Sequence, residues 1–164
     1  MLALGLLIIG ILSRYFIHIP NFTPVLAIAL FGGVYLDKRY AIFLPLALMV
    51  ISDMLIGFHH TFLFTWGSMI LIGIIGLCVR NHKNWGTILG SSLLSAILFF
   101  VISNFGVWIM GDHLYPQTAR GLRDCFIMAI PFFKNTLLST VIYTVVLFGS
   151  YQWFGARSPK LISA

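Results

Sequence analysis

Six apolar runs, separated by short polar breaks, occupy most of the 164-residue chain. They cover residues 2–17, 24–36, 40–58, 62–79, 85–110 and 135–154. A helix needs about 20 apolar residues to cross a bilayer, with a range of about 17–25. Membrane β-strands alternate apolar and polar residues over about ten positions, and these runs do not alternate. The pattern therefore predicts an all-α polytopic membrane protein with six transmembrane helices in a single domain, residues 1–164.

Composition supports this class of protein and excludes others. The chain is 60% hydrophobic and 9% charged, whereas an ordinary soluble domain is about 25% charged. A soluble fold of this size cannot bury so much apolar surface, which excludes a soluble enzyme and a disordered tail. Ten Lys and Arg residues stand against four acids, but they fall singly or in pairs between the runs. This spacing is typical of topology signals and contacts with lipid headgroups, and we expect no binding of nucleic acid.

Two segments depart from a simple series of spans. The run 24–36 is short, so we expect its helix to extend back through Asn21 or to lean against its neighbours. Residues 111–134 are expected to begin as a loop and continue, over 118–133, as an amphipathic helix that lies at the outer membrane surface or folds over the helix ends. Pro131 is then expected to turn the chain into the sixth span, with a polar tail over 156–164.

Basic residues in the loops predict the orientation in the inner (plasma) membrane. With a cytoplasmic N-terminus the inner loops hold six Lys and Arg residues and the outer loops four, and the loop 57–61 holds none. We therefore expect both termini to be cytoplasmic. The six inner residues are Lys38, Arg39, Arg80, Lys83, Arg157 and Lys160, and the four outer ones are Arg14, Arg120, Arg123 and Lys134.

Polar side chains from distant parts of the sequence are predicted to meet at one depth. Asp53 lies four residues before Gly57, about 6 Å below the outer end of its span, and Asn104 lies four residues before Trp108 at a similar depth. An Asp inside a span costs about 2.5–3.5 kcal/mol on insertion scales, so it needs a partner or a wet cavity. We therefore predict a solute-binding pocket that is open to the outside. Its candidate ligand-binding residues are Asn21, Thr23, Asp53, Asn104, Trp108, Tyr115, Arg120, Arg123 and Asn135.

Each residue type suggests a role in the pocket. Asp53, Asn104 and Asn21 would form hydrogen bonds with the solute, and Asp53→Ala is expected to abolish binding while leaving expression and helicity intact. Trp108 and Tyr115 would stack on the solute. Arg120 or Arg123 would pair with Asp53 or with an acidic solute. Alternatively, Asp53 and Asn104 serve only contacts between helices, and Trp66 and Trp108 belong to an interfacial aromatic belt.

The signatures of catalysis and of cofactor binding are weak. A serine protease inside the membrane needs a His or Lys base in a span, and an aspartyl enzyme needs two acids, whereas Asp53 is the single acid inside a run. The pair His59–His60 has no third ligand at a suitable spacing. We expect no catalytic residue, cofactor or metal site. A structural or assembly subunit without a ligand remains the first alternative, and a small intramembrane enzyme the second.

Several short segments carry a resemblance to a known family. They are PNFTPV at 20–25, ALFGGVY at 29–35, SDMLIG at 52–57, SNFGVW at 103–108, YP at 115–116 and PFFKNTL at 131–137. These segments resemble a family of small bacterial membrane proteins that looks like the substrate-binding S components of energy-coupling factor (ECF) transporters. The family's motif residues fall on Asn21, Asp53, Asn104, Trp108, Tyr115 and Asn135.

The resemblance implies a six-helix bundle that captures a vitamin-like or metal-related solute from the outer side. It also implies delivery by tilting while docked on a separate transmembrane module with ATPases. S components often dock through small residues spaced by four on the first helix, and Ala3, Gly5 and Gly10 lack that spacing. The pairs Ala29/Gly33 and Gly86/Gly90 have it and are expected to be helix-packing positions.

Overall fold

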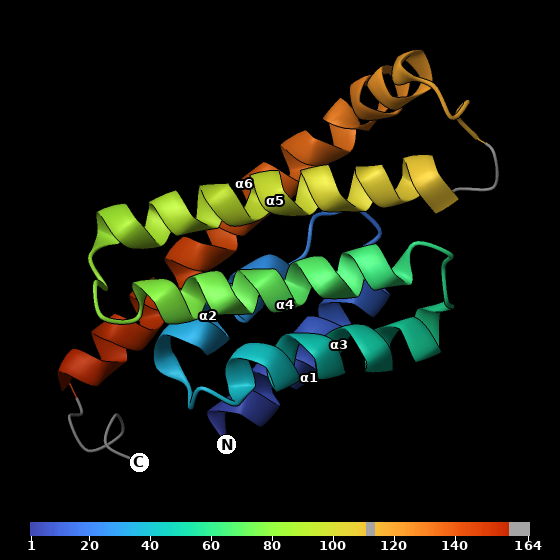
Figure 1. Cartoon of the computed structure of the whole chain (residues 1–164). Coiled ribbons are helices and arrows are strands. Elements are labelled where there is room, and N and C mark those ends of the chain that lie inside the picture. Colours follow the sequence, from blue (N-terminus) through green and yellow to red (C-terminus); the bar gives the residue numbers. More distant parts are fainter. Residues whose placement is uncertain (111–113, 158–164) are drawn as a thin grey trace.

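The computed structural model describes residues 1–110 and 114–157, and the regular structure of these residues is entirely α-helical (Figure 1). Residues 111–113 of the expected loop and 158–164 of the expected tail lie outside this part. The prediction of an all-α chain is confirmed. The helices are α1 (Leu2–Phe16), α2 (Val25–Tyr35), α3 (Tyr40–Ile56), α4 (Phe62–Val79), α5 (Trp85–Met110) and α6 (Ala119–Arg157).

Three of the six helices are long and apolar enough to cross a membrane. They are α4, α5 and the stretch Ala119–Gly155 of α6, whereas α1, α2 and α3 are shorter apolar helices of 15, 11 and 17 residues. Large apolar side chains such as Leu4, Leu63 and Val146 are more than half exposed on the bundle surface. Such exposure suits contact with lipid, so the chain has the character of a membrane protein.

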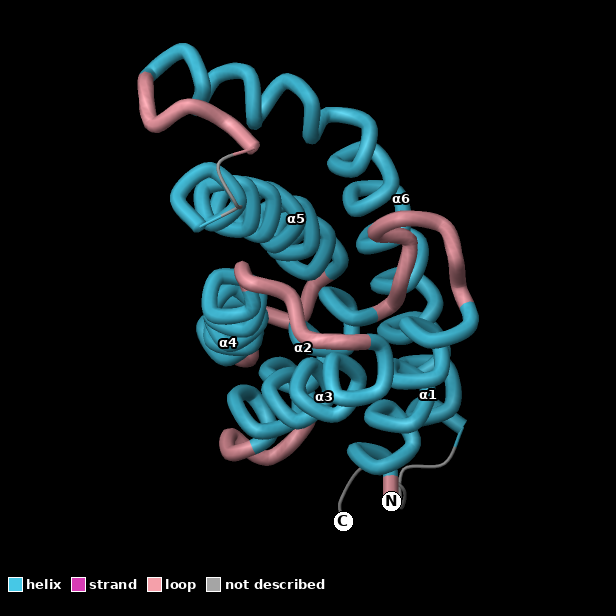
Figure 2. The backbone as a smooth tube through the Cα atoms, turned by 90° about the vertical axis from the view of Figure 1, so that its right-hand side faces the viewer, coloured by secondary structure: helices cyan, strands magenta, loops and turns pink. Residues whose placement is uncertain are grey.

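Helix α2 lies at the centre of the bundle and contacts each of the other five helices (Figures 1 and 2). Every residue from Val25 to Val34 is buried. The sequence of α2 is apolar on all sides, and a helix of that kind is stable only when neighbours surround it completely.

Glycines allow α2, α3 and α4 to pack closely. A Cβ atom added at Gly33 would lie 2.8 Å from Cα of Gly76 and would collide with the carbonyl oxygen of Gly73. A Cβ atom at Gly73 would collide with the carbonyl oxygen of Ala41 in α3. The prediction of close packing is thus confirmed at Gly33. It is wrong at Gly90, where an added Cβ would meet nothing within 4 Å.

Helix α6 is one continuous helix of 39 residues, with Pro131 inside it. The expected break between an amphipathic helix over 118–133 and a separate sixth span is therefore wrong. Proline lacks an N–H group and removes one helical hydrogen bond, which bends a helix but need not end it. In Figure 2 the N-terminal part of α6 curves over the end of α5. The ring of Phe100 in α5 holds this arrangement, with ring centroids 5.4 Å from Phe126 and 4.6 Å from Phe133.

Helix α2 is too short to fill the depth of the bundle. It begins at Val25 and does not extend back through Asn21, so its 11 residues rise about 16 Å against about 39 Å for the 26 residues of α5. The loop 17–24 takes up part of the remaining depth. Asn135 Nδ2 donates to the carbonyl oxygen of Pro20 at 3.0 Å, and Ser139 Oγ donates to that of Asn21 at 3.2 Å, so α6 anchors this loop.

Asn21 adopts a φ of 58°, in the left-handed region that asparagine and glycine tolerate best. Asn21→Val is expected to lower the free energy of unfolding by about 1–2 kcal/mol relative to Asn21→Gly, because a β-branched residue is strained there. Thermal unfolding of both variants in the same detergent measures the difference. Equal stability of the two variants would show that the loop relaxes without cost.

Candidate functional site

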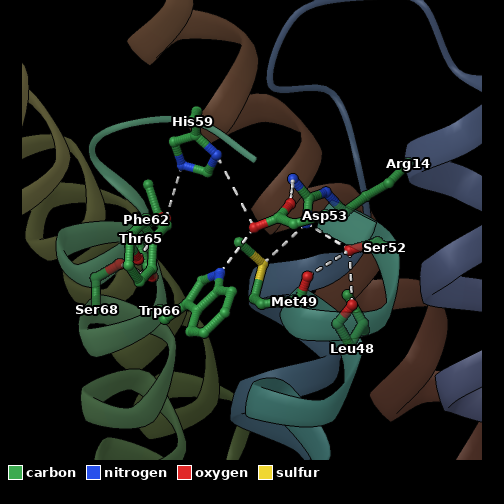
Figure 3. Close-up of polar contacts among 10 residues, drawn as sticks. All are labelled: Arg14, Leu48, Met49, Ser52, Asp53, His59, Phe62, Thr65, Trp66 and Ser68. Carbon is green, nitrogen blue, oxygen red and sulfur yellow. Dashed lines mark hydrogen bonds and ion pairs between the residues drawn. The ribbon is translucent and has the colours of Figure 1, made fainter. Parts of the chain in front are cut away.

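The site is built around Asp53, in the last turn of α3, whose side chain is 1% exposed. Its Oδ1 lies 2.8 Å from Nη2 of Arg14, and its Oδ2 accepts a hydrogen bond of 2.7 Å from Nε1 of Trp66 (Figure 3). Nδ1 of His59 lies 3.9 Å from the same Oδ2. Both carboxylate oxygens therefore have strong partners, as a buried charge requires.

Arg14 links the end of α1 to α3. Besides its ion pair, its Nη1 contacts Oγ of Ser52 at 2.5 Å and Sδ of Met49 at 3.2 Å. Ser52 in turn donates to the carbonyl oxygen of Leu48 at 2.6 Å. The α3 side chains Met49, Ser52 and Asp53 thus all contact the guanidinium group of Arg14. The side chain of Arg14 is 19% exposed.

His59 and Thr65 extend this network to the start of α4. Nε2 of His59 lies 3.1 Å from Oγ1 of Thr65, and that hydroxyl donates to the carbonyl oxygen of Phe62 at 3.0 Å. The imidazole of His59 therefore connects the loop after α3 to the first turn of α4. Figure 3 shows His59 above Asp53, on the loop that joins α3 to α4.

A cavity of about 330 Å³ lies beside this network, at the end of the bundle where α3 ends and α4 begins, which we call the cavity end. It occupies the space that the short helix α2 leaves, because Val25 and Leu26 at the start of α2 are part of its wall. Thr136 of α6 is also part of the wall. The polar residues that line this cavity are Arg14, His18, Asn21, Thr23, His59, Thr65 and Thr136.

A second cavity of about 190 Å³ adjoins the first. The two share Asn21, Thr65, Phe99 and Thr136 as lining residues. The second cavity adds side chains from α5 and from α6 near Pro131. These are Phe100, Ser103, Asn104, Val107, Phe132 and Phe133, together with Thr61.

Three of the nine predicted ligand-binding residues line these cavities. Asn21 and Thr23 line the first, and Asn21 and Asn104 line the second. Asn104 Nδ2 also donates to the carbonyl oxygen of Phe100 at 2.7 Å. Asp53 lines neither cavity and lies behind Arg14, so its place is to hold Arg14 rather than to touch a solute.

The other five predicted residues line neither cavity. Arg120 and Arg123 were expected to pair with Asp53, and this is wrong: both lie beside Asp124, at 3.9 and 2.9 Å. The physical reason is that α6 begins on the side of α5 that faces away from α3 (Figure 1), whereas Arg14 already contacts Asp53. Trp108 donates to the carbonyl oxygen of Pro116 at 3.0 Å, and Asn135 fastens the loop 17–24 as described above. Tyr115, although half-buried, also lies outside both cavity walls.

Sequence reasoning missed Arg14, Trp66, His59 and Thr65 as site residues. Arg14 was assigned to an outer loop as a topology signal. The sequence does contain a signal for the pairing of Arg14 with Asp53. Arg14 is the single cation in the run 2–17, Asp53 is the single acid in the run 40–58, and both lie near the ends of their runs. Isolated opposite charges at matching depth usually pair inside a membrane.

The residues that the structure describes contain no group of three or more His, Cys, Asp and Glu side chains that could hold a metal ion. The chemistry available at the cavity is therefore that of a guanidinium, two imidazoles, hydroxyls and amides. These groups bind solutes mainly as hydrogen-bond donors and acceptors.

Comparison with known protein families shows where the chain belongs. The model of a family of unknown function, DUF6580, matches residues 1–161. No curated protein and no solved structure matches the chain, so the resemblance to ECF S components stays a prediction. Because the family match covers nearly the whole chain, the protein belongs to the DUF6580 family.

Proposed function

We propose that the protein is a membrane-embedded binding protein that captures a small solute from the outer side of the inner membrane for uptake. The observation that carries the proposal is the polar cavity of about 330 Å³ backed by the buried Arg14–Asp53 pair. Ligand pockets typically have volumes of about 300–1,000 Å³ and a few convergent polar groups. A bundle that served only to hold helices together would gain stability by filling this space with side chains.

The placement of the chain ends supports an outward-facing cavity. Leu2 and Leu6 of α1 and Phe154 and Gly155 of α6 line one apolar groove, so both ends of the helical chain lie at one end of the bundle. Residues Ile56, His59 and Thr65 place the cavity where α3 ends and α4 begins. Figure 1 shows these helix ends on the side of the bundle opposite to the two termini. With cytoplasmic termini and six crossings of the inner membrane, the cavity opens to the outside.

The ECF-like part of the proposal rests on the resemblance of the motif segments. It adds that the solute is vitamin-like or metal-related and that a separate module with ATPases drives its release. A structural or assembly subunit is favoured less, since the polar side chains at the cavity end line open space. An intramembrane enzyme is also favoured less, because the titratable group nearest to Asp53 is an arginine, which does not release its proton.

Native mass spectrometry of the purified protein tests the proposal. We expect the wild-type protein to carry a co-purified small molecule. Thr23→Trp, which places a large ring in the first cavity, should reduce the bound fraction about tenfold or more, a loss of about 1.4 kcal/mol. Val146→Trp is the matched control, since Val146 is 56% exposed on α6 and should leave the bound fraction unchanged.

Two results would contradict the proposal. One is a wild-type protein that carries no small molecule after purification in mild detergent or in lipid nanodiscs. The other is a bound molecule that both tryptophan variants retain equally.

A further inference from the structure

We infer that the cavity selects a small organic anion, whose carboxylate or similar oxyanion binds to Arg14 while its apolar body extends into the second cavity. This inference rests on the proposed function and names the chemical class of the solute. Four features of the described residues carry it: free donors on Arg14, the start of α2, the absence of acids from the cavity wall, and the rings of the second cavity.

Arg14 has hydrogen-bond donors to spare. A guanidinium group has five N–H bonds. Among the described residues, Nη1 has two acceptors, Ser52 and Met49, and Nη2 has one, Asp53. Among these residues, none accepts from Nε–H or from the second N–H of Nη2. Because Arg14 lines the cavity, both groups can donate to a ligand there. Two donors of one guanidinium plane match the two oxygens of a carboxylate.

The start of α2 adds a positive potential at the cavity wall. The first hydrogen bond of this helix runs from Ile28 N to the carbonyl oxygen of Pro24, and no side chain caps its N-terminus. The N–H groups of Val25, Leu26 and Ala27 therefore lack helical acceptors. Val25 and Leu26 line the cavity, and the N-terminus of a helix carries about half a positive charge.

Among residues 1–110 and 114–157, no acidic side chain lines the cavity wall opposite these groups. Asp53 is covered by Arg14 and Trp66, and it is the one acid that contacts the network among the described residues. The Arg14–Asp53 pair is thus oriented with its positive end toward the cavity. His18 and His59 add two imidazoles to the same wall.

The second cavity suits the apolar part of such a solute. The rings of Phe99, Phe100 and Phe133 line it, and Ser103 and Asn104 supply a few polar atoms. The first cavity would hold the charged group, and the shared wall at Asn21 and Thr136 would lie along the middle of the solute. An aliphatic or aromatic carboxylate fits this arrangement better than a cation or a highly hydrated sugar.

A charge-selective labelling experiment tests the inference without knowledge of the solute. A cysteine is placed in the cavity wall by Thr23→Cys, in a background in which Cys78 and Cys125 are replaced by serine. Its rate of modification is measured with anionic methanethiosulfonate ethylsulfonate and with cationic methanethiosulfonate ethyltrimethylammonium. Each rate is divided by the rate of the same reagent with 2-mercaptoethanol.

We expect the normalised anion-to-cation ratio to be about ten, because a positive local potential concentrates anions and repels cations. The double variant Arg14→Gln/Asp53→Asn removes both charges while keeping neutral hydrogen-bonding groups, and it should bring the ratio toward one. Arg14→Lys keeps the charge and should preserve the preference for the anion, which separates the effect of charge from that of misfolding.

The outcomes distinguish the inference from the proposed function. A cysteine that reacts readily but prefers the cation, or a preference that survives the double variant, would overturn the assignment of an anionic solute and leave the cavity in place. A cysteine that reacts with neither reagent would show that the cavity is closed, which contradicts the proposed function as well.

Discussion

Asp53→Ala is expected to destabilise the protein by about 3–5 kcal/mol, because the guanidinium group of Arg14 then loses its counter-ion in a largely buried position. The indole N–H of Trp66 loses its acceptor at the same time. Thermal or denaturant unfolding in detergent measures the effect. The expectation from sequence alone, that this variant loses only solute binding, thus gives way to a combined loss of stability and binding.

A surface pair provides the matched control. Asp37 forms an ion pair with Arg39 at 3.2 Å, but the two side chains are 55% and 81% exposed. Exposed pairs contribute about 0–1 kcal/mol, so Asp37→Ala should be close to the wild type. Arg14→Gln/Asp53→Asn should recover part of the stability that Asp53→Ala loses. If Asp53→Ala is as stable as Asp37→Ala, the buried ion pair does not hold α1 against α3.

The second large effect concerns the contact of α4 with α3. Gly73→Ala is expected to lower the free energy of unfolding by about 3 kcal/mol, because the new methyl group collides with the backbone of Ala41. Backbone atoms cannot move aside as a flexible side chain can, so the helices must separate. The thermal unfolding temperature and the retained monodisperse fraction after heating report this effect.

Gly90→Ala is the control for the same chemical change. A Cβ atom at Gly90 meets nothing within 4 Å, and alanine is favoured over glycine inside a helix by about 1 kcal/mol. This variant should therefore match or exceed the wild type in stability. Similar losses in both variants would mean that glycine at position 73 is not required for packing.

The sequence predicts the helices better than their ends and connections. Helices α4 and α5 coincide with the predicted runs 62–79 and 85–110, because a long apolar run bounded by polar residues has few alternatives in a bilayer. The predicted end of a helix at Pro131 is wrong, because α6 continues through this residue. Proline removes only one helical hydrogen bond, and Phe133 packs against Phe100 just beyond it. The start of α2 depends on how the loop 17–24 is anchored to α6, which is a tertiary contact.

The sequence predicts the depth of the candidate site in the bundle but not the direction in which each side chain points. Counting residues along helices placed Asn21, Thr23, Asp53 and Asn104 at the cavity end. It does not give the rotation of each helix, so it did not reveal that Asp53 points to Arg14 and lies behind the cavity wall. Loop charges alone place Arg14 outside the first span, so the sequence favours Arg120 or Arg123 as the partner of Asp53.

The most direct test of the central claim is an experimental structure of the protein purified without added solute. We predict density for a small non-protein molecule in the cavity, in contact with Nε or Nη2 of Arg14, and Asp53 covered by Arg14 and Trp66. A cavity closed by side chains, with Arg14 turned away from Asp53 toward the lipid, would contradict the account.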